Sequence, residues 1–232
     1  MQRHERVGIN SNQSGLLAKY SRLLEYNSSY CNITAVRSNG VTYGIVPEHF
    51  KIKTRTLLVG KGRKDFEKAS RLMKAFKSTN SLNWVKVISS SDVGLSKSDE
   101  PVAVGSTLAV LANVYNTFLW TLNPVRVISS SYSTPSIDPD TQELFSEITY
   151  STLEGHLMEG DERFRVSMLP SFRSSSPALF GTSVQAGDVL FEVTSYAKGY
   201  GLLGTLCFPL IKPLQDKFLR DTTISMQKLM RE

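Results

Sequence analysis

Apolar residues recur every three or four positions in three segments, a spacing that predicts amphipathic helices. The segments are 16–26, 65–76 and 203–229. Their apolar positions are Leu16, Leu17, Tyr20, Leu23 and Leu24; Phe66, Ala69, Leu72, Met73 and Phe76; and Leu203, Leu206, Leu210, Leu214 and Phe218. Pro209 and Pro213 lie in the last segment, so we expect the chain to enter that helix there or to kink it.

Alternating or β-branched stretches predict about six antiparallel β-strands. They occupy 51–60, 84–90, two or three strands within 102–130, and then 147–156, 163–169 and 189–198. Turns are expected at Asn116, at Asn123–Pro124 and at 157–162. Arg163 and Arg165 alternate with apolar neighbours, so we expect both to face solvent.

An early helix, a set of antiparallel strands and a long closing helix indicate an α+β fold. A curved sheet must bury one face, and segment 203–229 is its expected cover. A pocket is expected between these layers wherever side chains do not fill the space. We expect 1–21 to form a flexible N-terminal tail with a short helix, and 22–232 to form a single domain. The Ser- and Pro-rich segments 131–147 and 170–188 are interpreted as long polar insertions.

Charge and composition narrow the choice of partners. The chain has 232 residues, of which 41% are hydrophobic, and a net charge of +6. That balance is ordinary for a globular protein with a real core. The basic residues are dispersed, apart from short clusters at 51–55 and 61–64, so we expect no nucleic-acid partner. The longest apolar stretch, 199–211, is too short to span a bilayer, and no integral membrane association is expected.

Targeting and cofactor signals are weak. The first ten residues lack the apolar core of a secretory signal, so a cytoplasmic protein is expected, with organelle targeting as the alternative because this stretch is basic. Cys31 and Cys207 are far apart and suit buried thiols rather than a disulfide framework or a metal site. Gly60 and Gly62 precede a helix, but no complete phosphate-binding motif surrounds them, so no cofactor is expected.

Three residues are candidates for acid–base chemistry. His156 lies in the densest polar pattern of the chain and could act as a general base near neutral pH. Glu162 is a candidate carboxylate partner for it. Glu192, on the last predicted strand, would have a raised pKa if it faced inward and would be a solvated charge if it faced outward. A structural role for His156 in the hairpin is the alternative, and no metal site is expected because three ligands do not converge in sequence.

Aromatic residues with polar tips could line an apolar pocket. The candidate ligand-binding residues are Trp84, Trp120, Tyr150, Thr152 and Tyr196. The alternative is that most of the aromatic residues simply fill the core.

Three stretches together resemble one known family. They are 59–84, 191–221 and, most specifically, 150–164 with the sequence YSTLEGHLMEGDERF. The last is similar to the pattern Tyr-Gly-Thr-Leu-x-Gly-His-x-x-x-Gly-Glu-Glu-x-Phe of the domain of unknown function family DUF1990. Ser151 stands at the first glycine of that pattern and Asp161 at the first glutamate. The resemblance covers about residues 22–230 and implies a START-like helix-grip fold; it implies no activity.

These observations lead to two main hypotheses. The first is a START-like protein that binds a small hydrophobic molecule between the sheet and the C-terminal helix. The second is an enzyme, a cyclase, isomerase or hydrolase, that uses His156 and a carboxylate in the same cavity. A regulatory binding module that uses the basic surface or segment 16–26 is a third class. The sequence leaves the ligand and the oligomeric state open.

Overall fold

The computed structural model describes residues 50–89, 100–114, 120–132, 144–153, 156–170 and 184–232. The predicted helix at 16–26, the tail before it and the expected turn at Asn116 lie outside these residues. The elements are β1 (Lys51–Lys61), α2 (Gly62–Lys74), α3 (Lys77–Asn80), β2 (Val85–Ser89), β3 (Thr107–Asn113), β4 (Trp120–Tyr132), β5 (Leu144–Thr152), β6 (Met158–Met168), β7 (Asp188–Gly199) and α4 (Gly201–Arg231).

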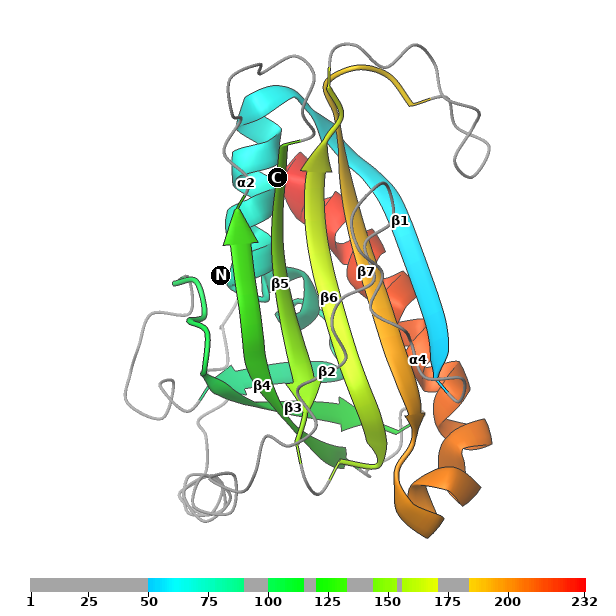
Figure 1. The fold of residues 1–232 in the computed structure, drawn as a ribbon. Helices are drawn as coiled ribbons and strands as arrows, with labels where there is room; N and C mark the ends of the chain where they lie inside the picture. Colours follow the sequence, from blue (N-terminus) through cyan, green and yellow to red (C-terminus); the bar gives the residue numbers. More distant parts are fainter. Residues whose placement is uncertain (1–49, 90–99, 115–119, 133–143, 154–155, 171–183) are drawn as a thin grey trace, which may run out of the picture.

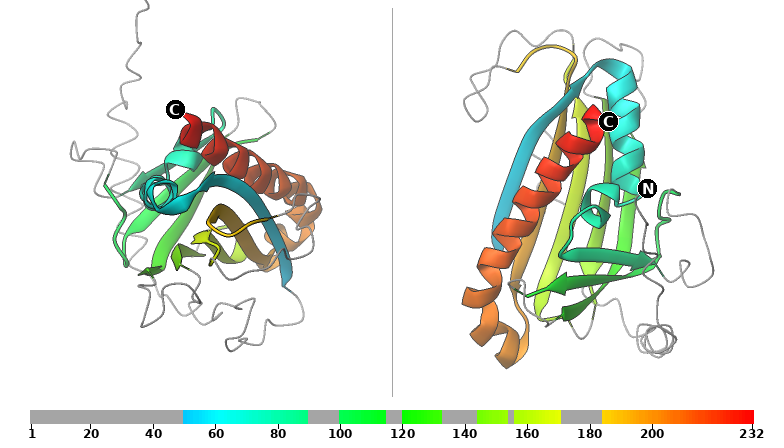
Figure 2. Two further views of the ribbon diagram at one scale, coloured as in Figure 1. Left: turned by 90° about the horizontal axis from the view of Figure 1, so that it is seen from above. Right: turned by 180° about the vertical axis from the view of Figure 1, so that it is seen from behind.

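A single antiparallel sheet of seven strands forms the frame of the molecule. Its order is β1-β7-β6-β5-β4-β3-β2, so the first strand pairs with the last and the others follow as neighbours in sequence. The sheet is strongly curved, and α4 runs along its concave side (Figures 1 and 2). The predicted cover helix over 203–229 is therefore confirmed.

The core fills the space between the sheet and the helices. Alternate residues of the central strands point inward, including Val125, Ile148, Phe164 and Phe191, and all four are almost completely buried. From α4, Phe218 packs edge-on against the ring of Phe164, with 6.4 Å between the ring centroids. Burial of side chains of this size contributes about 1.5–3 kcal/mol each, which fixes α4 on the sheet.

The helical pair α2–α3 covers the other half of the concave side. Phe66, Ala69 and Met73 are buried on one face of α2, as the helical spacing predicted. Phe76 separates the two helices with a left-handed backbone (φ 51°), a conformation that bulky residues rarely adopt. Its side chain is fully packed against Phe164, which compensates for that backbone cost.

Two of the predicted turns are wrong. Asn123 and Pro124 lie within β4, where Pro124 is opposite Ala109 of β3. Proline has no N–H to donate to a neighbouring strand, but the Pro124 carbonyl still accepts the N–H of Leu153, just after β5 ends. Residues 158–162 belong to β6, and Tyr150 pairs with Glu162. The connection between β5 and β6 therefore lies at 153–157.

The prediction that Arg163 faces solvent is also wrong. Arg163 is only 4% exposed, and its guanidinium donates to Glu192 at 2.7 Å. Thr194, its partner on β7, is buried as well, so the convex face is shielded from solvent at this pair. Alternation identified the face correctly but did not reveal that Arg163 is buried on it.

The insertions begin and end differently from their predicted limits. β4 continues to Tyr132 and β5 begins at Leu144, so both ends of the 131–147 segment are strand. β7 begins at Asp188, the last residue of the 170–188 segment. Residues 133–143 and 171–183 lie outside the described part of the chain.

Candidate functional site

A cavity of about 320 Å³ lies between the concave face of the sheet and α4. Every strand from β2 to β7 contributes to its wall, as does the first half of α4. Its lining consists of Trp84, Val85, Val110, Ala112, Val114, Thr121, Asn123, Val125, Tyr150, Thr152, His156, Leu157, Met158, Gly160, Asp161, Glu162, Ser195, Tyr196, Ala197, Ile211, Leu214, Gln215 and Phe218. Most of this wall is aliphatic or aromatic, so the cavity is an apolar space with a few polar groups.

A line of hydrogen bonds crosses the cavity wall from helix to sheet. The Gln215 side-chain amide of α4 donates to Ser195 Oγ of β7 at 2.6 Å. Ser195 in turn hydrogen-bonds Glu162 of β6, and the Tyr150 hydroxyl of β5 donates to Glu162 Oε2. Four elements therefore hold one carboxyl group in position.

Burial controls the ionisation of Glu162. Removal of the carboxylate from water raises the pKa of Glu162 to about 7, although the hydrogen bonds from Tyr150 and Ser195 work in the opposite direction. The pKa of Tyr150 is raised well above its ordinary value by burial first and by the Glu162 charge second. The carboxyl group thus changes its charge near neutral pH, while Tyr150 stays a neutral donor.

His156 is buried in the connection between β5 and β6. Its Nδ1 accepts the backbone N–H of Met158 at 2.9 Å, so the ring proton of the neutral form is assigned to Nε2. Burial lowers the pKa of His156 to about 4, because the charged ring would lose its hydration there. His156 is therefore neutral at physiological pH, and it shapes the turn while it lines the cavity.

Thr152 and Gly160 of the 150–164 pattern also serve the backbone. Thr152 Oγ1 accepts the N–H of Gly160 at 3.0 Å, across the mouth of the hairpin. Gly160 has a φ of 153°, and a Cβ there would meet the Tyr196 carbonyl oxygen at 1.7 Å. Only glycine fits this position. Much of the dense pattern is therefore explained by strand pairing. Glu162 is the member of the pattern whose side chain is available for acid–base chemistry or ligand binding.

Glu192 lies on the opposite face of the sheet from Glu162. Its neighbours Phe191 and Val193 occupy the core, and its carboxylate binds Arg163 and accepts from Thr56 at 3.4 Å. Tyr196 borders the cavity, but the charges that act on its hydroxyl include Arg163 and Glu192. The structure therefore brings His156 and Glu162 to one cavity and does not bring Glu192 to it.

The predicted aromatic lining is divided in the same way. Trp84, Tyr150 and Tyr196 contact the cavity, and so does Thr152. Trp120, at the start of β4, is 48% exposed and is not part of the wall. Alternation could not place Trp120, because it stands at the end of its strand rather than within it.

Sequence reasoning missed Ser195 and Gln215. The available signal was a polar residue on an apolar helix face: Gln215 is next to Leu214 and lies on the same side of α4 as Ile211 and Phe218. A buried polar side chain needs a partner, and Ser195 on the facing strand is that partner.

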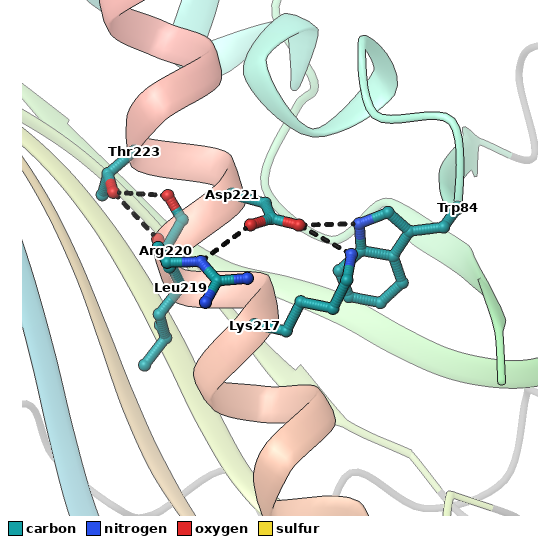
Figure 3. Close-up of polar contacts among 6 residues, drawn as sticks. All are labelled: Trp84, Lys217, Leu219, Arg220, Asp221 and Thr223. Atoms are coloured by element: carbon teal, nitrogen blue, oxygen red, sulfur yellow. Dashed lines mark hydrogen bonds and ion pairs between the residues drawn. The ribbon is translucent and has the colours of Figure 1, made fainter. Parts of the chain in front are cut away.

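The Trp84 indole contacts Lys217 and Asp221 of α4 (Figure 3). Its indole Nε1–H donates to Asp221 at 3.1 Å, and the Lys217 ammonium lies 3.7 Å from the ring centroid. Lys217 and Arg220 also pair with Asp221, at 2.7 and 3.1 Å. Burial alone would raise the pKa of Asp221, but these hydrogen bonds outweigh it and the pKa is lowered. The wall of the cavity and the second half of α4 are thereby tied together.

Within the described residues, no group of three His, Cys, Asp or Glu side chains is arranged to hold a metal ion. Across the same residues, no helix is both long and apolar enough to cross a membrane.

A curved antiparallel sheet gripped by a long C-terminal helix, with a cavity between them, is a helix-grip fold. The chain belongs to the family described as domain of unknown function DUF1990, whose model matches residues 35–224. This confirms the resemblance carried by 59–84, 150–164 and 191–221.

Two relatives are similar to the chain over about three quarters of its length. The chain is 24% identical to the UPF0548 protein of Arabidopsis thaliana over 77% of its own length and 73% of the relative's. It is 25% identical to a UPF0548 protein of Dictyostelium discoideum, over 78% and 73%. Among solved structures, a START superfamily protein from Mycobacterium smegmatis is similar with a TM-score of 0.41 and 12% identity, over 79% of this chain and 97% of the other.

Proposed function

We propose that this protein binds a small, largely apolar molecule in the cavity between the sheet and α4. The observation that carries the proposal is the cavity itself: about 320 Å³ of space with an apolar wall, within the size range of ligand pockets. Val110, Val125 and Phe218 would contact the apolar part of such a molecule. Glu162 and Tyr150 would meet its polar group.

The experiment compares a cavity-filling variant with a surface variant on the same helix. Leu214 lines the cavity, whereas Leu206, two turns earlier on α4, is 67% exposed. Leu214→Trp places a large ring in the ligand space and is expected to lower the affinity for the neutral fluorophore N-phenyl-1-naphthylamine at least tenfold. Leu206→Trp leaves the space open and should bind like the wild type. Equal binding by both variants would reject this cavity as the site.

A second candidate is acid–base catalysis in the same cavity, and the observation that favours it is the pKa of Glu162. A carboxyl group that titrates at about pH 7 in an apolar site has the properties of a general base. Neutral His156 could supply a hydrogen-bond donor from Nε2. Glu192 has no part in this proposal, because its carboxylate is paired with Arg163 on the convex face.

A generic proton-abstraction probe tests the second candidate without knowledge of the substrate. Ring opening of 5-nitrobenzisoxazole needs only a base in an apolar site. We expect a rate that rises with pH about a midpoint near 7 in the wild type and that is lost in Glu162→Gln. A rate no greater than that of free acetate in buffer would eliminate general-base chemistry at Glu162.

A further inference from the structure

The Glu162 carboxyl has no cationic partner in the cavity wall. Among the described lining residues there is no Lys or Arg; the titratable ones are Tyr150 on β5, His156 in the β5–β6 connection, Asp161 and Glu162 on β6, and Tyr196 on β7. The lining residues from β2, β3, β4 and α4 are uncharged.

Two cationic residues that adjoin lining residues in sequence are already engaged elsewhere. Arg163 follows Glu162 in sequence, but its guanidinium binds Glu192 on the convex face. Lys217 lies against the Trp84 ring and pairs with Asp221 at 2.7 Å. Neither residue lines the cavity. The negative charge that Glu162 acquires is therefore balanced by no side chain of the described wall.

The hydrogen bonds around Glu162 point toward it. Gln215 donates to Ser195, so the Ser195 hydroxyl hydrogen is available for Glu162, and the Tyr150 hydroxyl donates from the other side. A carboxylate accepts at about four lone-pair sites, and these two donors occupy only part of them. An ammonium group, with up to three N–H donors and a positive charge, is complementary to the remainder.

We propose that the molecule bound in this cavity is an organic cation, an apolar body with one protonated amino group, and that Glu162 is its counter-ion. This inference rests on the proposed ligand-binding function and names the class of ligand. Tyr150 and Trp84, whose rings lie in the same wall, provide the aromatic surface that cations favour. An anionic head group would meet an uncompensated carboxylate and is excluded.

Three ligands of equal chain length provide the test: octylamine, octanol and octanoate. Their affinities are measured at pH 8 by displacement of N-phenyl-1-naphthylamine from the full-length protein. We expect octylamine to bind at least tenfold more tightly than octanol, and octanoate to bind most weakly. Octanol that binds as tightly as octylamine would overturn the cation proposal and leave the apolar site intact. If none of the three displaces the bound probe, the cation proposal is rejected, and the comparison of Leu214→Trp with Leu206→Trp still decides whether the cavity is an apolar site.

Two glutamine variants separate the counter-ion from general charge effects. Glu162→Gln is expected to lower octylamine affinity at least tenfold and to leave octanol affinity within threefold, which also shows that the variant folds. Glu159→Gln removes a carboxylate from the same strand, one that pairs with Lys198 outside the cavity, and should change neither affinity. An octylamine preference that persists in Glu162→Gln would overturn the assignment.

The pH dependence gives an independent reading. Octylamine must bind the ionised form of Glu162, so its affinity should fall about tenfold between pH 8 and pH 6. His156 stays neutral over this range because its pKa is about 4. Burial raises the pKa of Asp161, another lining residue, to about 6, so the same pH series on Glu162→Gln is the control. An octylamine affinity that is constant from pH 8 to pH 6 while octanol binds normally would contradict the role of the Glu162 charge.

Discussion

Glu162 and His156 make opposite contributions to the pH dependence of folding. The folded pKa of Glu162 is raised from 4.5 to about 7, so the folded state holds this proton more tightly and stability is lost as pH rises from 4.5 to 7. The folded pKa of His156 is lowered from 6.5 to about 4, so stability is lost as pH falls from 6.5 to 4. The two effects oppose each other between pH 4.5 and 6.5.

Replacement of Glu162 should reveal the loss of stability that its raised pKa causes as pH rises. Glu162→Gln carries no charge at any pH, so it avoids the burial cost that the ionised wild-type carboxylate has at high pH. Relative to the wild type, we expect this variant to gain about 1–3 kcal/mol of unfolding free energy on going from pH 5 to pH 8. Urea unfolding at both pH values measures the difference. A constant difference would show that the Glu162 carboxyl is solvated in the folded protein.

Replacement of His156 tests its structural role. In His156→Asn, Oδ1 can still accept the Met158 N–H, whereas His156→Ala removes that acceptor. We expect the alanine variant to lose about 1–3 kcal/mol more than the asparagine variant at pH 7.5, because a buried N–H is left unpaired. Both variants should lose the acid-side decline between pH 6.5 and 4. Equal stability of the two variants at pH 7.5 would mean that the hydrogen bond is dispensable.

At the scale of elements, α4 is attached unevenly. Its second half carries the Trp84–Lys217–Asp221 contacts (Figure 3). The buried Phe218 belongs to the same half. Its first half contains Pro209 and Pro213, which cannot donate backbone hydrogen bonds, and the exposed Leu206. We infer that the second half anchors the helix on the sheet, while the first half, which contributes Ile211 to the cavity wall, is held by fewer bonds.

Asp221→Ala should loosen this anchor. The substitution leaves the Trp84 indole N–H without its acceptor and removes the partner of Lys217 and Arg220, so we expect a loss of about 1–3 kcal/mol and faster amide hydrogen exchange over 214–231. Asp216→Ala is the matched control on the same helix, because the Asp216 side chain, which pairs with Lys53, is 58% exposed. That control should lose no more than about 0.5–1 kcal/mol. Similar losses in both variants would remove the special role of Asp221.

The sequence was sufficient to predict helices and strands whose buried residues recur with a single period. The 3.6-residue spacing predicted the helix α4 and, at Leu214 and Phe218, its inward face, although Leu206 of the same spacing is 67% exposed. The alternation of β7 predicted the strand but left its inward face open. The same reasoning failed at Pro124 and at 157–162. Turns were predicted there, but Pro124 lies within β4 and residues 158–162 lie within β6, because the pairing with neighbouring strands decides where a strand ends. It also failed at Arg163, whose burial depends on what covers the convex face.

The candidate site was predictable only in part, because some of its contacts depend on how distant elements pack against each other. His156 and Glu162 stood out as polar residues in a dense motif, and both reach the cavity. Ser195 and Gln215 are distant in sequence and become partners only when β7 and α4 face each other. Whether Glu192 or Glu162 faces inward depended on the register of two strands, which alternation alone left undecided.

At the scale of the whole molecule, the curvature of the sheet and the long helix leave space that side chains do not fill. Filling that space would impair function only if a molecule occupies it in the functioning protein. We therefore propose that the cavity between Trp84, Glu162 and Gln215 binds an apolar molecule.

A crystal structure of the protein grown with octylamine tests this claim most directly. The account predicts density for the alkyl chain along Val125 and Phe218, with the nitrogen within hydrogen-bonding distance of a Glu162 carboxylate oxygen. A cavity closed by side chains, or a ligand bound only on the outer surface of the protein, would contradict it.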